Sequence, residues 1–153
     1  MGRTMNPLPA SGAFEGTVHR FPVRVYFEDT DLTGIVYHAN YLRYFERARS
    51  DMLRAVGIDQ RAAHEAGTGA YAVTQMDMKW TRPAKLDDAL VVESRVLEVR
   101  AASCVIQQRV SRGHELLAQA KVVAAFLSPD GRPVRQPSDW VQKFRAVEEG
   151  NDV

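Results

Sequence analysis

Side chains that could do chemistry crowd into one short connection of the sequence, DTDLTGIVYHANY, at residues 29–41. The connection contains two aspartates, a histidine and an asparagine, although a turn of this length needs only a signal such as Gly34. A carboxylate such as that of Asp31 can attack a carbonyl carbon or activate a water molecule for the attack. The surplus of polar groups therefore indicates that this connection carries a reaction.

An amphipathic helix is predicted directly after this connection, over residues 41–56. Its apolar residues recur at helical spacing, and Gly57 is expected to end the helix. Asn40 is a candidate N-cap, although His38 or Ala39 could begin the turn. Free backbone N–H groups and the positive end of the helix dipole gather at such an N-terminus, where they can hold a developing oxyanion. Asp31 and the backbone N–H of His38 are therefore candidates for the carboxylate and the oxyanion contact of one site.

The rest of the chain predicts an antiparallel sheet. A short helix is expected at 60–66, and runs of alternating apolar residues between turn signals indicate five strands, at 21–27, 72–80, 89–99, 103–110 and 116–127. One long helix with such a sheet is an α+β architecture, in which the sheet covers the apolar face of the helix. Because one helix covers only one face of the sheet, the chain is expected to form a homo-oligomer.

Length and charge narrow the class of protein. A chain of 153 residues with 45% hydrophobic residues fits one domain, expected at residues 19–145, with flexible segments at 1–18 and 146–153. The formal net charge of +1, without a basic stripe, argues against a nucleic-acid ligand. The sequence shows neither an apolar leader nor a run of about 18 apolar residues, so a soluble, cytoplasmic protein without membrane insertion is expected.

Cysteine and histidine give no sign of a metal site. Cys104 is the only cysteine and lies in an apolar alternating run, so it is predicted to be a small buried residue and not a catalytic one. His19, His64 and His114 are scattered without the spacing of metal ligands. A chain of this length also buries enough surface to fold without a disulfide or a structural metal.

One long segment resembles a known family. Residues 24–57, RVYFEDTDLTGIVYHANYLRYFERARSDMLRAVG, are similar to the signature of the hot-dog-fold acyl-CoA thioesterases, specifically the Tol-Pal-associated branch close to the 4-hydroxybenzoyl-CoA thioesterases. The order of predicted strands to residue 127, including RPAKLDD at 82–88, is compatible with this resemblance. The resemblance implies a hot-dog fold and hydrolysis of an acyl-CoA without a cofactor. It also implies dimers or tetramers with active sites at subunit interfaces, and partners related to the cell envelope.

The resemblance assigns roles to individual residues. Asp31 matches the catalytic carboxylate, which acts as nucleophile or general base, and His38 matches the position whose backbone N–H polarises the thioester carbonyl. The imidazole of His38 is a further candidate for a catalytic role. Tyr37 and Asn40 match positions that line or shape the site. Glu46 corresponds to a helix acid that faces the acyl group in the 4-hydroxybenzoyl enzymes.

Coenzyme A carries phosphates, which need cations at the mouth of a pocket. Arg82, Lys85 and Arg112 lie at predicted strand ends or turns, where they could meet such phosphates. Two residues or segments depart from the family pattern. Phe27 stands where related sequences often have tyrosine, so no hydroxyl assists there, and the loop reads LTG, which leaves the loop shape and the preferred acyl group open.

Several of these residues also have a simpler structural interpretation. Asp29 is expected to be a turn acid that orders the loop, and the His38 imidazole could hydrogen-bond near the helix start without taking part in catalysis. Glu46 could be a solvated acid paired with Arg43 or Arg49 on the same helix. Three apolar residues at strand spacing are predicted to be core residues that could also border an acyl pocket: Met76, Met78 and Trp80.

Two other functions stay open from the sequence. The chain could be a non-catalytic acyl-binding or scaffold module of the hot-dog fold, although the retained Asp31 argues against that function. It could also be a dehydratase of the same fold, which removes water from a 3-hydroxyacyl thioester. The order DTD…G…VYHANY does not resemble the dehydratase arrangement, so thioester hydrolysis is the predicted activity.

Overall fold

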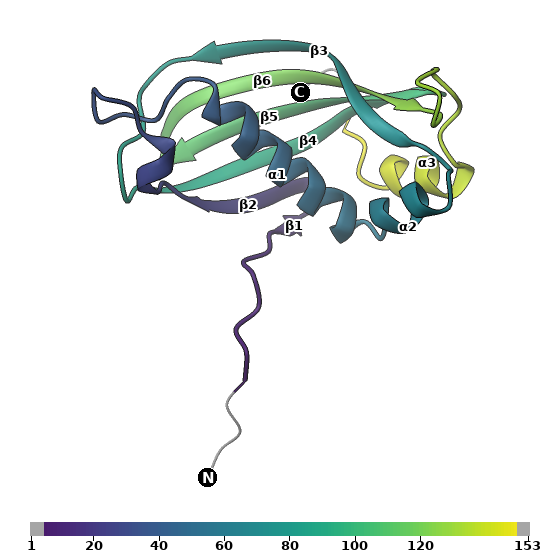
Figure 1. The fold of residues 1–153 in the computed structure, drawn as a ribbon, viewed down its shortest axis with the longest axis horizontal. Helices are drawn as coiled ribbons and strands as arrows, with labels where there is room; N and C mark the ends of the chain where they lie inside the picture. The colour runs from purple at the N-terminus through teal and green to yellow at the C-terminus, as the bar shows by residue number, and fades with distance from the viewer. Residues whose placement is uncertain (1–4, 150–153) are drawn as a thin grey trace.

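A curved antiparallel sheet packed against one long helix forms the structure, a computed structural model that describes residues 5–149 (Figure 1). The strands lie in the order β1-β2-β4-β5-β6-β3, so β1 and β3 are the two edges of the sheet. The strands are β1 (Ala13–Glu15), β2 (Val18–Arg24), β3 (Ala70–Trp80), β4 (Ala89–Val99), β5 (Ser103–Arg112) and β6 (Glu115–Leu127).

Helix α1 (Asn40–Ala55) follows β2 through the short 3-10 turn η1 (Phe27–Asp29) and a polar loop, and it packs on β2 and β4. Its apolar face is buried, and complete burial of one large apolar side chain stabilises the fold by about 1.5–3 kcal/mol. The buried apolar residues of this face are Tyr41, Tyr44, Phe45, Ala48, Met52 and Leu53. The helix ends before Gly57, whose φ of 88° favours glycine, as predicted.

Two shorter helices, α2 (Gln60–Glu65) and α3 (Ser138–Arg145), lie at the end of the sheet opposite the polar loop (Figure 1). Trp140 and Phe144 of α3 join Phe126 of β6 and Met52 of α1 in a second cluster of buried side chains. Helix α3 is not predicted from the sequence, because its position depends on packing against residues that are distant in the chain. Within residues 5–149, no helix is long and apolar enough to cross a bilayer.

Local irregularities bend the strands around α1. An extra residue in one strand of an antiparallel pair bends that strand and increases its twist. Such extra residues occur in β3 between Val73 and Gln75 and in β4 between Val96 and Glu98. A third lies in β6, where Val110 and Ser111 of β5 pair with Ala118 and Leu116. The bends explain how one long helix meets several strands of the sheet.

The predicted α+β class is confirmed, but within residues 5–149 the sheet has six strands and not five. The additional strand, Ala13–Glu15, pairs with β2 inside the segment that the sequence predicts to be flexible. The predicted first strand at 21–27 lies at Val18–Arg24 instead. Its expected last residue, Phe27, is in η1, because the Asp29 carboxylate accepts a hydrogen bond from the Tyr26 amide at 2.8 Å and holds the chain in a turn.

The C-terminal part of the chain also differs from the prediction. The Glu149 amide donates to the Val96 carbonyl oxygen at 2.8 Å, and the Glu148 carboxylate accepts a hydrogen bond from the Val99 amide at 2.7 Å. These bonds hold residues 146–149 against β4, where a flexible tail is expected. The remaining residues of the predicted flexible ends, 1–4 and 150–153, lie outside the described residues.

Candidate active site

The polar loop between η1 and α1 is organised around Asp29, which is buried. Its carboxylate holds the Tyr26 amide, and its carbonyl oxygen accepts two hydrogen bonds, from the Tyr37 amide at 2.9 Å and from the Asn40 side chain at 2.8 Å. The loop is thereby closed on itself next to the start of α1. Asp29 is a turn-forming acid, in agreement with the sequence analysis.

Asn40 is not the N-cap, and the turn into α1 begins at Ala39, one of the two alternative starts. Ala39 occupies the cap position, and Asn40 is the first residue of α1. The Asn40 side chain is buried and donates to the Asp29 carbonyl oxygen, so it is not available to cap the helix. Asn40 therefore shapes the loop from its buried side.

Asp31 lies on the exposed side of this loop. Its Oδ1 accepts two hydrogen bonds from Thr33, from the hydroxyl at 2.6 Å and from the amide at 2.8 Å. The hydroxyl bond is the largest cause of a lowered pKa for Asp31, so the group is a carboxylate at neutral pH. Within residues 5–149, Oδ2 accepts no hydrogen bond. Asp31 thus presents an anionic oxygen at the surface.

His38 lies in the turn that leads into α1. The centroid of its ring is 4.6 Å from that of Tyr37 and 5.8 Å from that of Trp80, and its carbonyl oxygen accepts a hydrogen bond from the Trp80 indole at 3.1 Å. The charge of His38 also lowers the pKa of Asp31, so the two side chains are within electrostatic reach. The His38 N–H donates to no acceptor in the described part of the chain. A free amide beside the positive end of α1 suits an oxyanion.

A cleft of about 280 Å³ opens beside His38. Its walls come from the polar loop, from α1 and from the segment after β3: Ile35, His38, Tyr41, Trp80, Arg82 and Pro83. Trp80, predicted as a core residue, is 45% exposed and lines this cleft, whereas Met76 and Met78 are partly buried against the core. Strand alternation places Trp80 on the apolar face, but it does not show that the last residue of the strand leaves the core.

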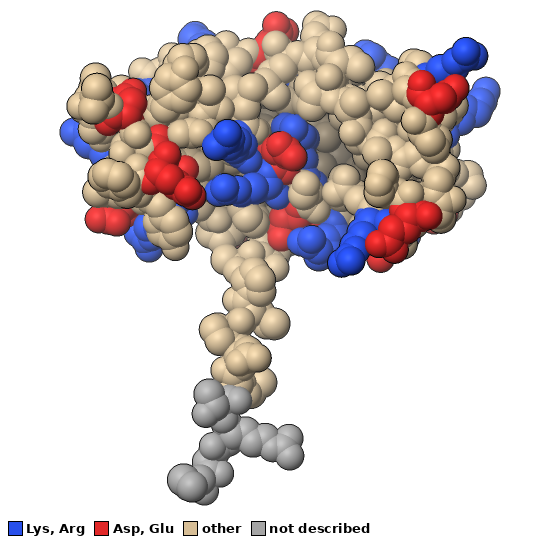
Figure 2. All heavy atoms as spheres, viewed as in Figure 1, with Lys and Arg blue, Asp and Glu red and all other residues tan. Residues whose placement is uncertain are grey.

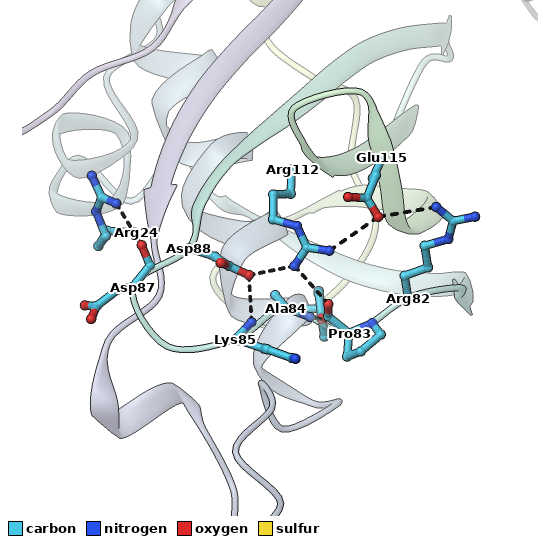
Figure 3. Close-up of polar contacts among 10 residues, drawn as sticks. Arg24, Arg82, Pro83, Ala84, Lys85, Asp87, Asp88, Arg112 and Glu115 are labelled. Atoms are coloured by element: carbon cyan, nitrogen blue, oxygen red, sulfur yellow. Dashed lines mark hydrogen bonds and ion pairs between the residues drawn. The ribbon is translucent and has the colours of Figure 1, made fainter.

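The three cations predicted for CoA phosphates lie on and beside the loop of residues 82–88 (Figure 3). Arg82 forms an ion pair with Glu115 at 3.3 Å, and Arg112 forms one with Asp88 at 2.7 Å. The side chain of Lys85 forms no ion pair within residues 5–149. Of the three, Lys85 is therefore the cation without a carboxylate partner among the described residues.

Tyr37 and Glu46 are separated in the structure. Tyr37 is exposed beside His38, whereas Glu46 lies further along α1 and borders a different cavity of about 300 Å³, between α1 and β3. The alternative ion pair of Glu46 with Arg43 or Arg49 is not formed in the described chain, and Arg49 donates to the Gln108 side chain at 2.9 Å. Figure 2 shows a group of basic side chains over this helix, around an acidic one.

A second aspartate and histidine meet away from this loop. His19 of β2 and Asp51 of α1 are buried, with His19 Nε2 2.8 Å from Asp51 Oδ2. The same oxygen accepts a hydrogen bond from the Gly12 amide at 2.9 Å. Burial is the largest cause of a lowered pKa for His19. Among the described residues, no cluster of histidine, cysteine and acidic side chains could hold a metal ion.

Comparisons with known proteins agree with this architecture. The family model of the Thioesterase-like superfamily matches residues 25–145. The acyl-CoA thioesterase YbgC of Haemophilus influenzae is 45% identical over 125 residues, which cover 81% of this chain and 92% of that protein.

Two solved structures show the same fold. A probable thioesterase from Bartonella henselae is 36% identical with a TM-score of 0.74, and the match covers 78% of this chain and 99% of that chain. A mutant 4-hydroxybenzoyl CoA thioesterase, complexed with 4-hydroxybenzoyl CoA, is 25% identical with a TM-score of 0.75, covering 83% and 98%. The sheet and its central helix therefore define a protein of the hot-dog thioesterase class. The chain belongs to the thioesterase-like superfamily.

Proposed function

We propose that this chain hydrolyses an acyl-CoA, with Asp31 as nucleophile or general base and the His38 amide as the oxyanion contact. The observation that carries the proposal is one loop that holds an anionic carboxylate with a free oxygen and a free backbone N–H at the positive end of α1. The name of the Haemophilus influenzae relative and the bound ligand of the 4-hydroxybenzoyl CoA thioesterase support the substrate class.

Two chemical routes fit this pair of groups. As nucleophile, Asp31 adds to the thioester carbon, the C–S bond breaks, CoA leaves as a thiolate, and water then hydrolyses the mixed anhydride. As general base, Asp31 takes a proton from water while the water oxygen adds to the carbon, and that proton passes to the departing sulfur. In both routes negative charge develops on the carbonyl oxygen, where the His38 N–H donates.

Other residues are assigned by their position around the cleft. Arg82 and Lys85, beside its mouth, would meet the phosphates of CoA, and Tyr37 would border the bound thioester. Asn40 would act indirectly, by holding the loop through the Asp29 carbonyl oxygen.

Self-association is part of the proposal. Phe27 of η1 and Leu32 of the polar loop are exposed apolar side chains, and β3 is an edge of the sheet within the described residues. A dimer or tetramer with the site at a subunit contact would cover such surface, and it could bring Glu46 of one subunit towards the acyl group of another. Light scattering over a dilution series is expected to show a stable multimer, and a fully active monomer at micromolar concentration would contradict this assignment.

Hydrolysis of a panel of acyl-CoAs, followed by release of free thiol, tests the activity. Asp31→Asn keeps the size of the side chain and is expected to lower kcat about a hundredfold or more while the protein stays folded. Asp77→Asn, at an exposed acid of β3, is the matched control and should retain the wild-type rate. Equal turnover by the wild type and Asp31→Asn would refute the assignment of Asp31.

The same panel separates the other two functions. A scaffold module would bind acyl-CoA without releasing thiol, and a dehydratase would convert 3-hydroxyacyl-CoA to the unsaturated thioester. Thiol release that depends on Asp31 would exclude both as the main activity. An envelope-related partner, which the resemblance implies, would be sought separately, by affinity capture with Asp31→Asn as bait.

A further inference from the structure

We propose that Arg112 is a positioning residue for the reaction: it fixes the loop of residues 83–88, and this loop holds the segment that carries Asp31 and His38. The inference rests on the proposed thioesterase function. It replaces the expectation that Arg112 meets a phosphate of CoA.

The guanidinium of Arg112 is bound on three sides (Figure 3). One nitrogen donates to the Asp88 carboxylate at 2.7 Å and to the Pro83 carbonyl oxygen at 3.2 Å, and the other lies 3.4 Å from the Glu115 carboxylate. A planar guanidinium can serve several acceptors at fixed angles, which a lysine ammonium does not reproduce. Arg112 thus connects the end of β5 to the start and the end of the 83–88 loop.

Asp88 connects Arg112 to the backbone of the 83–88 loop. The carboxylate oxygen that meets Arg112 also accepts a hydrogen bond from the Lys85 amide at 2.8 Å. Asp87 beside it has a φ of 71°, which is unusual for a residue with a side chain. Its carbonyl oxygen accepts a hydrogen bond from the Arg24 side chain at 2.8 Å, and its amide donates to the Val25 carbonyl oxygen at 2.9 Å. The loop is therefore held in one conformation from both sides.

The 83–88 loop in turn contacts the proposed catalytic segment. The Val36 amide donates to the Ala84 carbonyl oxygen at 2.9 Å, and Ile35 forms an antiparallel bridge with Lys85. The Ile35 carbonyl oxygen accepts a hydrogen bond from the Asp31 amide at 2.9 Å. A short series of hydrogen bonds therefore runs from Arg112 to the backbone of Asp31.

The same loop is anchored to the helix. The Ala84 amide donates to the Tyr41 hydroxyl at 3.1 Å, and Ala84 is fully buried. Because Tyr41 and His38 belong to the same helix start, a displaced loop would move the proposed oxyanion contact as well as the carboxylate. Reacting groups must be held within roughly 0.5 Å of their productive positions. Loss of Arg112 is therefore expected to slow the chemical step.

Steady-state kinetics separate positioning from phosphate binding. Arg112→Met, which keeps the apolar stem, is expected to lower kcat about tenfold or more and to change KM less than about threefold. Asp88→Asn should reproduce this pattern without touching the arginine, and the double variant should be no worse than the more severe single variant. Arg112→Lys keeps the charge but not the fork, so it should keep KM and lose kcat.

A matched control is Arg100→Met. Arg100 forms an ion pair with Glu98 at 3.1 Å, at the other end of β4, and its loss should leave kcat and KM at wild-type values. A higher KM with unchanged kcat in Arg112→Met would overturn the proposal in favour of a phosphate contact. A wild-type kcat in a folded Arg112→Met protein would overturn it outright.

Amide hydrogen exchange gives a readout that needs no activity. The Val36 amide is expected to exchange about tenfold faster in Arg112→Met than in the wild type or in Arg100→Met, because its acceptor sits on the released loop. Unchanged Val36 exchange would overturn the proposal even if the protein proves not to be a thioesterase. If Asp31→Asn loses activity while Arg112→Met keeps both kcat and Val36 protection, only the positioning role fails.

Discussion

Two pairs of aspartate and histidine use the same residue types in opposite ways. His19 and Asp51 are buried between β2 and α1 and lie 2.8 Å apart. Asp31 and His38 lie on an exposed loop, with no hydrogen bond between their side chains in the described chain. The closer pair, His19 and Asp51, is therefore buried away from any substrate.

The difference lies in what each carboxylate leaves unbound. Asp51 Oδ2 is shared between His19 and the Gly12 amide, so the buried pair joins the edge of the sheet to α1. Asp31 is ordered through Oδ1 alone, and Oδ2 stays free of protein donors within residues 5–149. A carboxylate that is held through one oxygen keeps the other oxygen available to react. A buried carboxylate whose oxygen already accepts from two partners instead stabilises the fold.

The largest effect, on the free energy of unfolding, is expected when the buried pair of His19 and Asp51 is broken. His19→Ala leaves the Asp51 carboxylate buried with fewer partners, and it is expected to lower the free energy of unfolding by about 3 kcal/mol. The folded fraction should keep its kcat. His64→Ala, at an exposed residue of α2, should stay within about 0.5 kcal/mol of wild type. Urea unfolding measures both, and equal stability of the two variants would contradict a structural role for His19.

The next largest effect concerns the exposed pair. His38→Ala is expected to lower kcat/KM about tenfold to a hundredfold, because the ring orients water or the leaving thiolate beside a backbone N–H that remains. Stability should change little. An unchanged rate from pH 5 to 9 would remove the imidazole from the reaction, and a larger loss with a missing limb of the pH–rate profile would make it an acid or base. His114→Ala serves as the exposed control.

The pH dependence of stability sharpens the contrast. The pKa of His19 is lowered from 6.5 by burial, so below pH 6.5 the unfolded chain takes up a proton that the folded protein does not. The free energy of unfolding should therefore fall as the pH drops from 6.5 towards the lowered pKa, by up to about 1.4 kcal/mol per pH unit. This contribution is fully present above pH 6.5. In His19→Gln this pH dependence should vanish. An identical dependence of the free energy of unfolding on pH in the variant and the wild type would show that His19 does not cause it.

The smallest expected effect lies at Thr33. Thr33→Val removes the hydroxyl that contributes most to the lowered pKa of Asp31 and keeps the backbone hydrogen bond. The pKa of Asp31 should rise, so the acid limb of the kcat/KM profile should move to higher pH. At pH 7 the rate should stay within about twofold of wild type, because Asp31 remains ionised. Thr74→Val, at an exposed threonine of β3, should leave the profile in place.

Much of the fold could be predicted because alternation and helical spacing are local signals. The predicted strand at 89–99 coincides with β4, and the predicted long helix differs from α1 by one residue at each end. The missed elements depend on distant partners: β1 has three residues and exists through its pairing with β2, and α3 is fixed by its packing on Phe126. A single sequence does not reveal such partners.

The candidate site could be predicted only in part. The spacing of Asp31 and His38 before a helix predicts the loop as a candidate site, and both residues lie on it. Trp80 lines the cleft because β3 leaves the core at this residue. Arg112 restrains the loop through Asp88, which is 24 residues away from it in the sequence. Glu46 lies at another cavity because α1 turns it away from the cleft. Spacing along the chain encodes the face of a helix or strand, but it does not encode which cavity that face borders or which distant loop a side chain reaches.

The close approach at Gly12 has a consequence for how the chain tolerates cutting and tagging. A methyl group added there would lie 2.1 Å from the Arg20 carbonyl oxygen, so the backbone runs tight against β2 from this residue onwards. Its amide also reaches Asp51. Limited proteolysis should therefore cut among the exposed residues 5–11 and stop at Gly12. A chain that begins after Gly12 should lose the hydrogen bond from the Gly12 amide to Asp51. A tag inserted among the exposed residues 5–9 should leave the fold unchanged.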